Sequence, residues 1–286
     1  MEKDVQRVNL KGFDGIIATI ATSEDGGPIR RIINGRSRRP TGTFTSVKAG
    51  GRAMPYESVE GERRAMWIAE AAPSVRRLLA QPHRIEIAVS GRSRPLIFIP
   101  DLLLEVDESA ASRLTSGLPF AQALLAEPDD VGRGGARTVV VEIKSDADRR
   151  MADAEYRLKL RLARRVYNGL GVDFAVVPDS AALSVSDFPA VKQIVMKRHV
   201  AIDGRDIEIA TSRVHDAPVP LGDLAASLGS SHVGIAKVFA LQVRGLISID
   251  LNRPVNALTL VHAVRSNGVR RAPSHPVWPS GPYARA

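Results

Sequence analysis

The sequence predicts an α/β protein, in which a layered core of strands and helices is followed by a smaller domain rich in helices. Three observations support this fold class. Helical and strand-like patterns alternate from residue 59 to residue 177, a helix–turn–helix–strand order follows between residues 221 and 251, and 44% of the 286 residues are hydrophobic. Such a length favours two domains, and such a composition is typical of globular proteins with a sizeable core.

The core domain is predicted to span residues 53–180. Strands are indicated where apolar residues alternate or run together, and helices where they recur every three or four positions. The expected elements are a helix over Val59–Leu79, strands over Ile85–Val89 and Arg94–Val106, a helix over 108–127, a strand over Thr138–Lys144, a basic amphipathic helix over 153–168 and a strand over Val172–Val177. Strands and helices in this order build a layered α/β core.

A second domain is predicted for residues 190–264. Its expected elements are a short helix over Leu221–Leu228, a turn at Gly229, a longer helix over Ser231–Arg244, a break at Gly245 and a strand over Leu246–Leu251. Glycines directly after the apolar periodic stretches indicate where the helices end. Helix, turn, helix and strand in this order form a winged-helix pattern.

The two ends of the chain are predicted to lie outside these domains. Residues 1–52 are expected to form a basic, loop-rich arm, because glycine, proline and arginine are frequent in its second half. Residues 265–286 carry a proline at every third position from Pro273 to Pro282. That spacing predicts a disordered or extended tail without a core of its own.

Composition excludes several classes of protein. The chain has no cysteine, so it cannot be a disulfide scaffold or use a thiolate as nucleophile or metal ligand. It has no G-x-S-x-G motif of a serine hydrolase and no P-loop of an ATPase. No apolar run is long enough to cross a membrane, and the first residues do not form a signal peptide. We therefore expect a cytoplasmic, nucleoid-associated bacterial protein.

Positive charge gathers in two places and predicts an anionic partner. The formal net charge is +9, and the stretch from residue 30 to residue 52 contains seven Lys and Arg but no acid. Each contact between such a side chain and a DNA phosphate releases bound counterions. The residues expected to contact double-stranded DNA are Arg36, Arg38 and Arg39 in the arm, and Arg157 and Arg161 on helix 153–168. The alternative is that both clusters are only solvated.

Charged residues at the ends of two predicted strands suggest hydrolytic chemistry. Asp101 interrupts the apolar run PLIFIPDLLLEV, and Glu142 and Lys144 close the run TVVVEIK, where they share one face of the strand. Two carboxylates from neighbouring strands offer the oxygen ligands that Mg²⁺ prefers, and a nearby ammonium group can orient water or stabilise charge on a phosphate. A strand-end ion pair, with Asp101 capping a turn, is the alternative.

Four separated motifs carry a resemblance to a known family. They are Glu62-Arg63 with Pro73 downstream, Gln81-Pro82, Pro100-Asp101 and Glu142-Ile143-Lys144. In this order they resemble the TnsA-type transposon endonucleases, which belong to the PD-(D/E)XK nuclease superfamily and have the restriction-endonuclease-like fold, a mixed sheet flanked by helices. The resemblance covers about residues 30–180. Both Glu60 and Glu62 are candidates for the helix glutamate, and the spacing to Gln81-Pro82 favours Glu62.

The resemblance implies a role for each of these residues. Asp101, Glu142 and Glu62 would hold Mg²⁺ or Mn²⁺, with the Ile143 carbonyl as a further ligand, and Lys144 would position the attacking water. The implied activity is that of the transposase subunit that hydrolyses phosphodiester bonds at the 5′ ends of a transposon. Its implied partners, besides double-stranded DNA, are a DDE-type transposase subunit and an AAA+ transposition ATPase.

Two other functions fit the sequence. The chain could be a stand-alone PD-(D/E)XK nuclease of a phage or restriction system, or a non-catalytic, basic winged-helix protein that binds DNA. The complete set Glu62, Asp101, Glu142 and Lys144 favours an enzyme, because a protein that only binds DNA has no reason to keep all four.

Overall fold

The computed structural model describes residues 5–13, 16–30, 40–125, 135–145, 148–179 and 181–264. In these ranges the chain is a mixed protein of helices and sheets, which agrees with the α/β class that the sequence predicts. Arg36, Arg38 and Arg39 of the expected arm, and the whole tail 265–286, lie outside the described residues. Within the described ranges, no single helix is both long enough and apolar enough to cross a bilayer.

A four-stranded mixed sheet forms the centre of the molecule. Its strands, in spatial order, are β10 (Asp173–Pro178), β9 (Ala136–Lys144), β8 (Leu102–Asp107) and β5 (Val75–Ala80). β9 and β10 are parallel, whereas the other neighbours are antiparallel. Because side chains alternate along a strand, Leu104 and Val139 face one core cluster while Leu103 and Val140 face the other.

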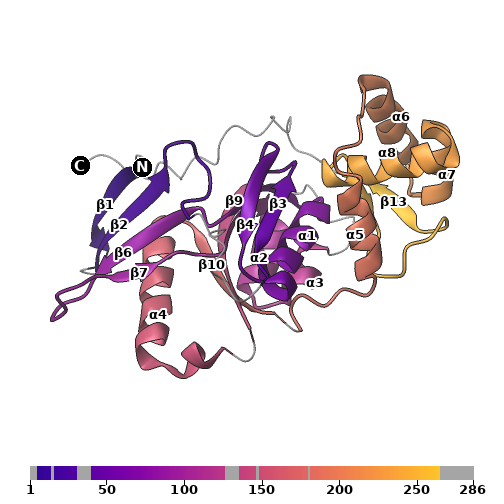
Figure 1. Cartoon of the computed structure of the whole chain (residues 1–286). Coiled ribbons are helices and arrows are strands. Elements are labelled where there is room, and N and C mark those ends of the chain that lie inside the picture. Colours follow the sequence, from indigo (N-terminus) through magenta and orange to yellow (C-terminus); the bar gives the residue numbers. More distant parts are fainter. Residues whose placement is uncertain are drawn as a thin grey trace.

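Helices cover both faces of this sheet. On one face lie the wide π-type turn η1 (Val59–Arg63), α1 (Arg64–Ala71), α2 (Glu108–Thr115) and α3 (Phe120–Leu124). On the other face lies α4 (Ala154–Gly169), whose apolar stripe includes Leu160 and Val166. Figure 1 shows α4 on the opposite side of β9 and β10 from α1 and α3.

A second sheet packs on the far side of α4. It consists of β1 (Val5–Phe13), β2 (Ile16–Ser23), β6 (His83–Ala88) and β7 (Leu96–Phe98), in that order and antiparallel throughout. β3 (Gly42–Ser46) and β4 (Arg52–Tyr56) form a separate hairpin. Much of the range 1–52, for which the composition predicted a loop-rich arm, is therefore strand, because Ile16, Ala18 and Ile20 bury against α4.

The C-terminal part combines helices with a small sheet. Its elements are α5 (Phe188–Met196), α6 (Gly204–Val214), β11 (Val219–Pro220), α7 (Leu221–Leu228), α8 (Ser231–Val243), β12 (Ile247–Ile249) and β13 (Leu260–Ala263). The three strands pair in the order β11-β13-β12. The positions of α7, α8 and the following strand agree with the sequence prediction, whereas α5, α6 and β13 were not predicted.

This part shares one hydrophobic core with the central sheet. Buried residues of α1, α5 and α8 belong to the same cluster, and the Gln242 side chain of α8 donates from Nε2 to the carbonyl of Ala71 at 3.0 Å. Arg198 donates similarly to the carbonyl of Thr45 at 2.8 Å. The predicted boundary near residues 180–190 therefore does not separate two independent cores.

Three predicted elements are wrong in detail, each because of a proline or glycine. The helix over Val59–Leu79 ends at Ala71, since the residue before Pro73 is forced into extended backbone, and Val75–Ala80 is a strand instead. Pro100 divides the strand over Arg94–Val106 into β7 and β8, which belong to different sheets. Gly117, at a φ of 89°, and Pro119 divide the helix over 108–127 into α2 and α3.

Candidate functional site

The ends of β8 and β9 bring Asp101 next to the Glu142–Lys144 segment. Leu102 is paired with Val141, so Asp101 and Glu142 occupy the next positions outward on the two antiparallel strands. Opposed residues of an antiparallel pair point to the same face of the sheet. Asp101 Oδ2 accepts a hydrogen bond of 2.6 Å from the backbone N–H of Ile143, which holds its carboxyl at the end of β9.

Glu142 is buried, and only one of its two carboxylate oxygens has hydrogen-bond partners among the described residues. Its Oε1 accepts hydrogen bonds from Lys144 Nζ at 2.5 Å and from the Tyr156 hydroxyl at 3.0 Å. Its Oε2 is also buried, but it has no hydrogen-bond partner among the described residues. Buried carboxylate oxygens are costly unless they are paired or bind a metal, so this oxygen is one that a bound cation would satisfy.

Glu62 reaches the same site from η1. Ser58 caps this turn by accepting the N–H of Gly61 at 2.9 Å, and a Cβ at Gly61 would lie 3.4 Å from Ile143. The turn is thus packed against the end of β9. Glu62 is buried and accepts the N–H of Glu57 at 3.0 Å, whereas the side chain of Glu60 is 78% exposed. Of the two candidate glutamates, only Glu62 points inward.

Burial and neighbouring negative charges raise the pKa values of two of these carboxyl groups, Asp101 and Glu62. Burial, followed by the negative charges of Glu142 and Glu62, raises the pKa of Asp101 well above its usual value. Burial and the charges of Glu57 and Glu142 raise the pKa of Glu62 to about 7. A cation placed among them would relieve both effects. No three His, Asp or Glu side chains form a ready-made set of metal ligands within the described ranges.

Lys144 supplies a permanent positive charge beside these acids. Its ammonium group is buried and bonded to Glu142. Burial lowers its pKa, but the charge and hydrogen bond of Glu142 outweigh this effect and raise the pKa to about 12. Lys144 is therefore charged at neutral pH and acts as a hydrogen-bond donor rather than as a base.

Tyr156 is a site residue that the sequence motifs did not reveal. The first turn of α4 is capped by Asp153, whose side chain accepts the N–H of Glu155 at 2.9 Å, and this cap aims the Tyr156 hydroxyl at Glu142. Cations surround its ring, at 4.8 to 5.3 Å from the centroid: Lys144, Arg150 and Lys159. An N-cap followed by an aromatic residue in the first turn is the signal that could have found it.

Gln81 supports Asp101 from behind. Its N–H donates to the Asp101 carbonyl at 2.8 Å, and its φ of 45° is the one positive value among the non-glycine residues that the structure describes. Such backbone strain persists only where the surroundings enforce it, and it is frequent at functional sites. The Gln81-Pro82 motif thus fixes the backbone that carries the Asp101 carboxylate.

The predicted DNA contacts of α4 lie on its solvent-facing side. Arg161 is exposed, and Arg157 is exposed as well, with one guanidinium N–H donated to the Ala152 carbonyl at 3.1 Å. By contrast, the cations of α8 are engaged inside the protein. Lys237 pairs with Asp206 at 2.6 Å, and Arg244 donates to the carbonyls of Ala240 and Val200.

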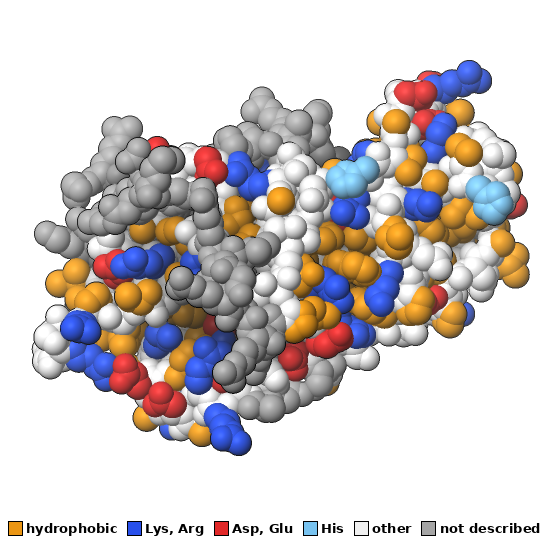
Figure 2. Space-filling model, in the orientation of Figure 1, with side chains coloured by type: hydrophobic (Ala, Val, Ile, Leu, Met, Phe, Trp, Pro, Cys, Tyr) orange, Lys and Arg blue, Asp and Glu red, His pale blue; other side chains and the backbone are white. Residues whose placement is uncertain are grey.

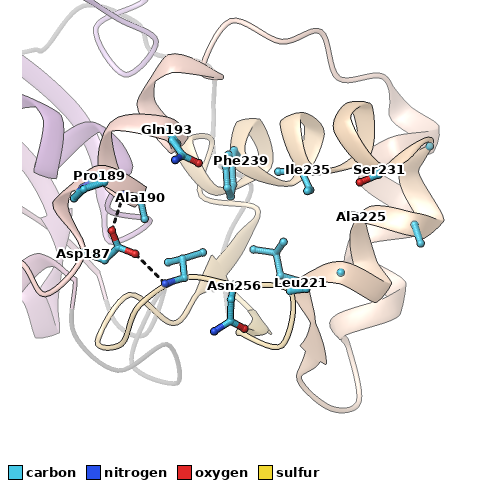
Figure 3. Close-up of a pocket in the computed structure, with 15 residues that line it drawn as sticks. Asp187, Pro189, Ala190, Gln193, Leu221, Ala225, Ser231, Ile235, Phe239 and Asn256 are labelled. Carbon is cyan, nitrogen blue, oxygen red and sulfur yellow. Dashed lines mark hydrogen bonds between the residues drawn. The ribbon is translucent and has the colours of Figure 1, made fainter.

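A hollow of about 640 Å³ opens in the C-terminal part. Figure 3 shows Leu221, Ile235 and Phe239 lining it from α7 and α8. Asp187 closes one side, where its two carboxylate oxygens accept the N–H groups of Ala190 at 2.9 Å and Val255 at 3.0 Å. The lining is therefore mostly apolar, and the Asp187 carboxylate in it already accepts two backbone hydrogen bonds.

No protein-family model matches the chain, and no curated protein matches it. What the chain does is therefore inferred from the side chains gathered at the ends of β8 and β9.

Proposed function

We propose that this chain is a metal-dependent endonuclease that hydrolyses phosphodiester bonds of double-stranded DNA. The observation that carries the proposal is the meeting of Asp101 and Glu142 at adjacent strand ends, with a buried Glu142 oxygen that lacks a hydrogen-bond partner within the described ranges. Lys144 and Glu62 lie beside them. A pair of acids held together against their own repulsion favours a cation-binding role over a purely structural one.

The site fits a hard divalent cation such as Mg²⁺ or Mn²⁺. Asp101 and Glu142 would hold it, with Glu62 either as a direct ligand or through water, and oxygen ligands of this kind suit both ions. When bound, the ion polarises the phosphate and lowers the pKa of a coordinated water. The remaining oxygen ligands would come from the Ile143 carbonyl, from water and from the DNA phosphate.

The other side chains position the reacting groups. Lys144 is charged and bonded to Glu142, so it can hold the attacking water and offset negative charge that develops on the phosphate. Tyr156 fixes the Glu142 carboxylate through its hydroxyl. Arg157 and Arg161 are exposed on α4, the helix whose Tyr156 contacts Glu142. They would contact the DNA backbone.

The architecture supports the resemblance to the TnsA-type family. A mixed sheet with helices on both faces, and the acids at the ends of two antiparallel neighbours, agrees with a restriction-endonuclease-like fold. The helices α6, α7 and α8 with their three-stranded sheet agree with a winged-helix domain. We therefore propose that the chain cuts the 5′ ends of a transposon, together with a DDE-type transposase subunit and an AAA+ ATPase.

The C-terminal part is proposed to hold a protein partner rather than to grip DNA. Its longer helix offers DNA neither Lys237 nor Arg244, because both are bonded internally. Its apolar hollow can take an apolar side chain of a partner.

The test is cleavage of supercoiled plasmid DNA by the full chain, with its cognate partners present. We expect cleavage that requires Mg²⁺ and is lost in Asp101→Ala, while DNA binding is retained. Glu105→Gln is the matched control, because Glu105 lies on the same strand but pairs with Arg77 at 3.3 Å, away from the site. Full cleavage by Asp101→Ala would refute the assignment, and no cleavage by the wild type would favour a DNA-binding protein without activity.

A further inference from the structure

A cluster of cations and aromatic rings lies where α1 meets α5, outside the candidate active site. We call Arg63, Trp67, Phe188 and Lys192 the Trp67 cluster. The rings of Trp67 and Phe188 stack, with centroids 6.1 Å apart. Arg63 and Lys192 each lie 5.7 Å from the centroid of Trp67. Figure 2 shows Lys and Arg side chains next to hydrophobic side chains over α1 and α5.

Two of the cations in this region form no ion pair with another described residue. Arg64 is held by three contacts. It stacks on Phe188 at 4.0 Å, donates to the Leu183 carbonyl at 3.0 Å and lies 3.9 Å from Glu60. Arg63 and Lys192, by contrast, have no carboxylate within ion-pair distance among the described residues. Aromatic faces attract such cations and restrict their positions, which leaves their N–H groups available to an anion.

The cluster adjoins the proposed active site. Arg63 is the last residue of η1 and directly follows Glu62, which points inward while Arg63 is partly exposed. The narrow hollow that Arg63, Trp67 and Lys192 line has a volume of about 80 Å³, room for a few water molecules or a phosphate group but not for a base pair. Arg64 and the carboxylate of Glu60 also line it, so its three cations outnumber its one acid. Size and charge therefore fit the sugar–phosphate backbone of DNA rather than its bases.

We propose that the Trp67 cluster binds the DNA backbone, with Arg63 and Lys192 contacting phosphates of the duplex on the α1–α5 side of the cut. The inference rests on the proposed function, because it takes duplex DNA as the substrate. It adds a second contact surface, on the opposite side of the central sheet from Arg157 and Arg161 of α4. A duplex lying across the ends of β8 and β9 would then be held from both sides.

Trp67 itself can report on this binding. The chain has two tryptophans, and Trp278→Phe leaves Trp67 as the single one. In this background and in EDTA, so that no cleavage occurs, a short duplex is titrated while the Trp67 emission and the binding affinity are recorded at several salt concentrations. We expect a saturable change in emission. We also expect the slope of log affinity against log salt to become shallower by roughly 0.9 for each phosphate that the double variant Arg63→Gln with Lys192→Gln no longer neutralises.

A control variant and a single variant complete the test. Arg213→Gln removes an exposed cation of α6 far from the cluster in sequence, and its slope should equal that of the wild type. Lys192→Gln alone changes an exposed side chain without hydrogen bonds among the described residues, and it should make the slope shallower by roughly 0.9. An unchanged slope in the double variant, or an unchanged Trp67 emission at saturating DNA, would overturn the inference.

Failure of this inference can be told apart from failure of the proposed function. If the double variant shows the shallower slope but the wild type never cuts DNA, the active site is wrong and the Trp67 cluster stands. If the wild type cuts DNA with Mg²⁺ while the double variant keeps the full slope, the active site stands and the Trp67 cluster is wrong.

Discussion

Two buried glutamates of the same protein have opposite surroundings. Glu70, on α1, is fully buried and accepts hydrogen bonds from the Ser46 hydroxyl at 2.5 Å and the N–H of Val47 at 2.8 Å, so both of its oxygens are satisfied. Lys48 lies beside it and donates to the carbonyls that end α1. Glu142 is nearly as buried, yet one of its oxygens has no partner among the described residues and its neighbours include two more acids.

The difference separates a structural charge from a functional one. Folding can bury a carboxylate at acceptable cost when each oxygen is bonded, as at the β3–β4 hairpin that Glu70 joins to α1. At the ends of β8 and β9 the protein instead collects carboxylates that repel one another and leaves an oxygen without a bond. Violations of this kind concentrate at sites that bind something.

The largest expected effect is on catalysis. Lys144→Ala should lower the cleavage rate by about 100- to 1,000-fold, because it removes the donor next to the proposed attacking water and the developing charge. The affinity for DNA should change little. Single-turnover cleavage and a binding titration measure the two effects, and Lys197→Ala, which changes an exposed lysine at the end of α5, is the control. A Lys144→Ala enzyme within a few-fold of the wild type would remove Lys144 from the mechanism.

Substitution of Glu70 should lower the stability of the protein more than substitution of Glu142. Glu70→Ala removes the carboxylate that Ser46, Val47 and Lys48 face in the core, so we expect the free energy of unfolding to fall by about 3–5 kcal/mol. Glu142→Gln loses the attraction of Lys144 but keeps an amide oxygen as acceptor and removes the repulsion from Asp101, so its loss should be smaller than that of Glu70→Ala. Urea denaturation measures both, and a larger loss in Glu142→Gln would reverse the comparison.

Glu62 should make the metal-free protein less stable as the pH rises. Burial first, and then neighbouring acids, raise its pKa to about 7 in the folded state from 4.5. Between these values the folded protein keeps a proton that the unfolded chain has lost, so stability is highest at the acid end and falls through pH 7. The loss amounts to roughly 3 kcal/mol. Denaturation in EDTA from acid to neutral pH should show a flatter profile for Glu62→Gln, and parallel profiles would contradict the prediction.

The smallest effect concerns where DNA is held. Arg161→Gln on α4 should make the slope of log affinity against log salt shallower by roughly 0.9, the loss of one neutralised phosphate. Lys237→Gln on α8 should leave that slope unchanged, because Lys237 is bound to Asp206. Point variants suit this test better than deletion of residues 190–286, since α8 shares the core of α1. Equal slopes for Arg161→Gln and the wild type would move the DNA away from α4.

Much of the fold could be predicted from the sequence wherever local signals agree. β9, α4, α7 and α8 follow from apolar periodicity together with caps such as Asp153 and breaks such as Gly245. Val75–Ala80 could not be predicted in this way, because so short a segment, with two arginines among its apolar residues, fits a helix or a strand, and only pairing with β8 decides between them. The strands between residues 5 and 46 were not predicted, because the frequent glycine, proline and arginine of residues 1–52 indicated loops.

The residues of the candidate site also fall into two groups, those that local sequence signals reveal and those that only tertiary contacts bring together. Asp101, Glu142 and Lys144 are visible as short motifs at strand ends. The inward direction of Glu62 over Glu60 depends on how η1 packs against Ile143, and Tyr156 meets Glu142 only once α4 folds back onto the sheet. The Trp67 cluster joins residues more distant still along the chain, and no local pattern brings Phe188 to Trp67. Tertiary contacts, rather than residue types, complete each site.

The most direct test of the proposed metal site is a calorimetric titration of the metal-free protein with Mn²⁺, without DNA. We predict saturable binding to the wild type, weakened at least about tenfold in Asp101→Asn, because a metal ligand is expected to contribute no less than the residues that support ligands. Glu70→Gln should bind the ion as the wild type does, since both Glu70 oxygens already accept hydrogen bonds, from Ser46 and Val47. Binding of the same strength in the wild type and Asp101→Asn would contradict a metal site at the ends of β8 and β9.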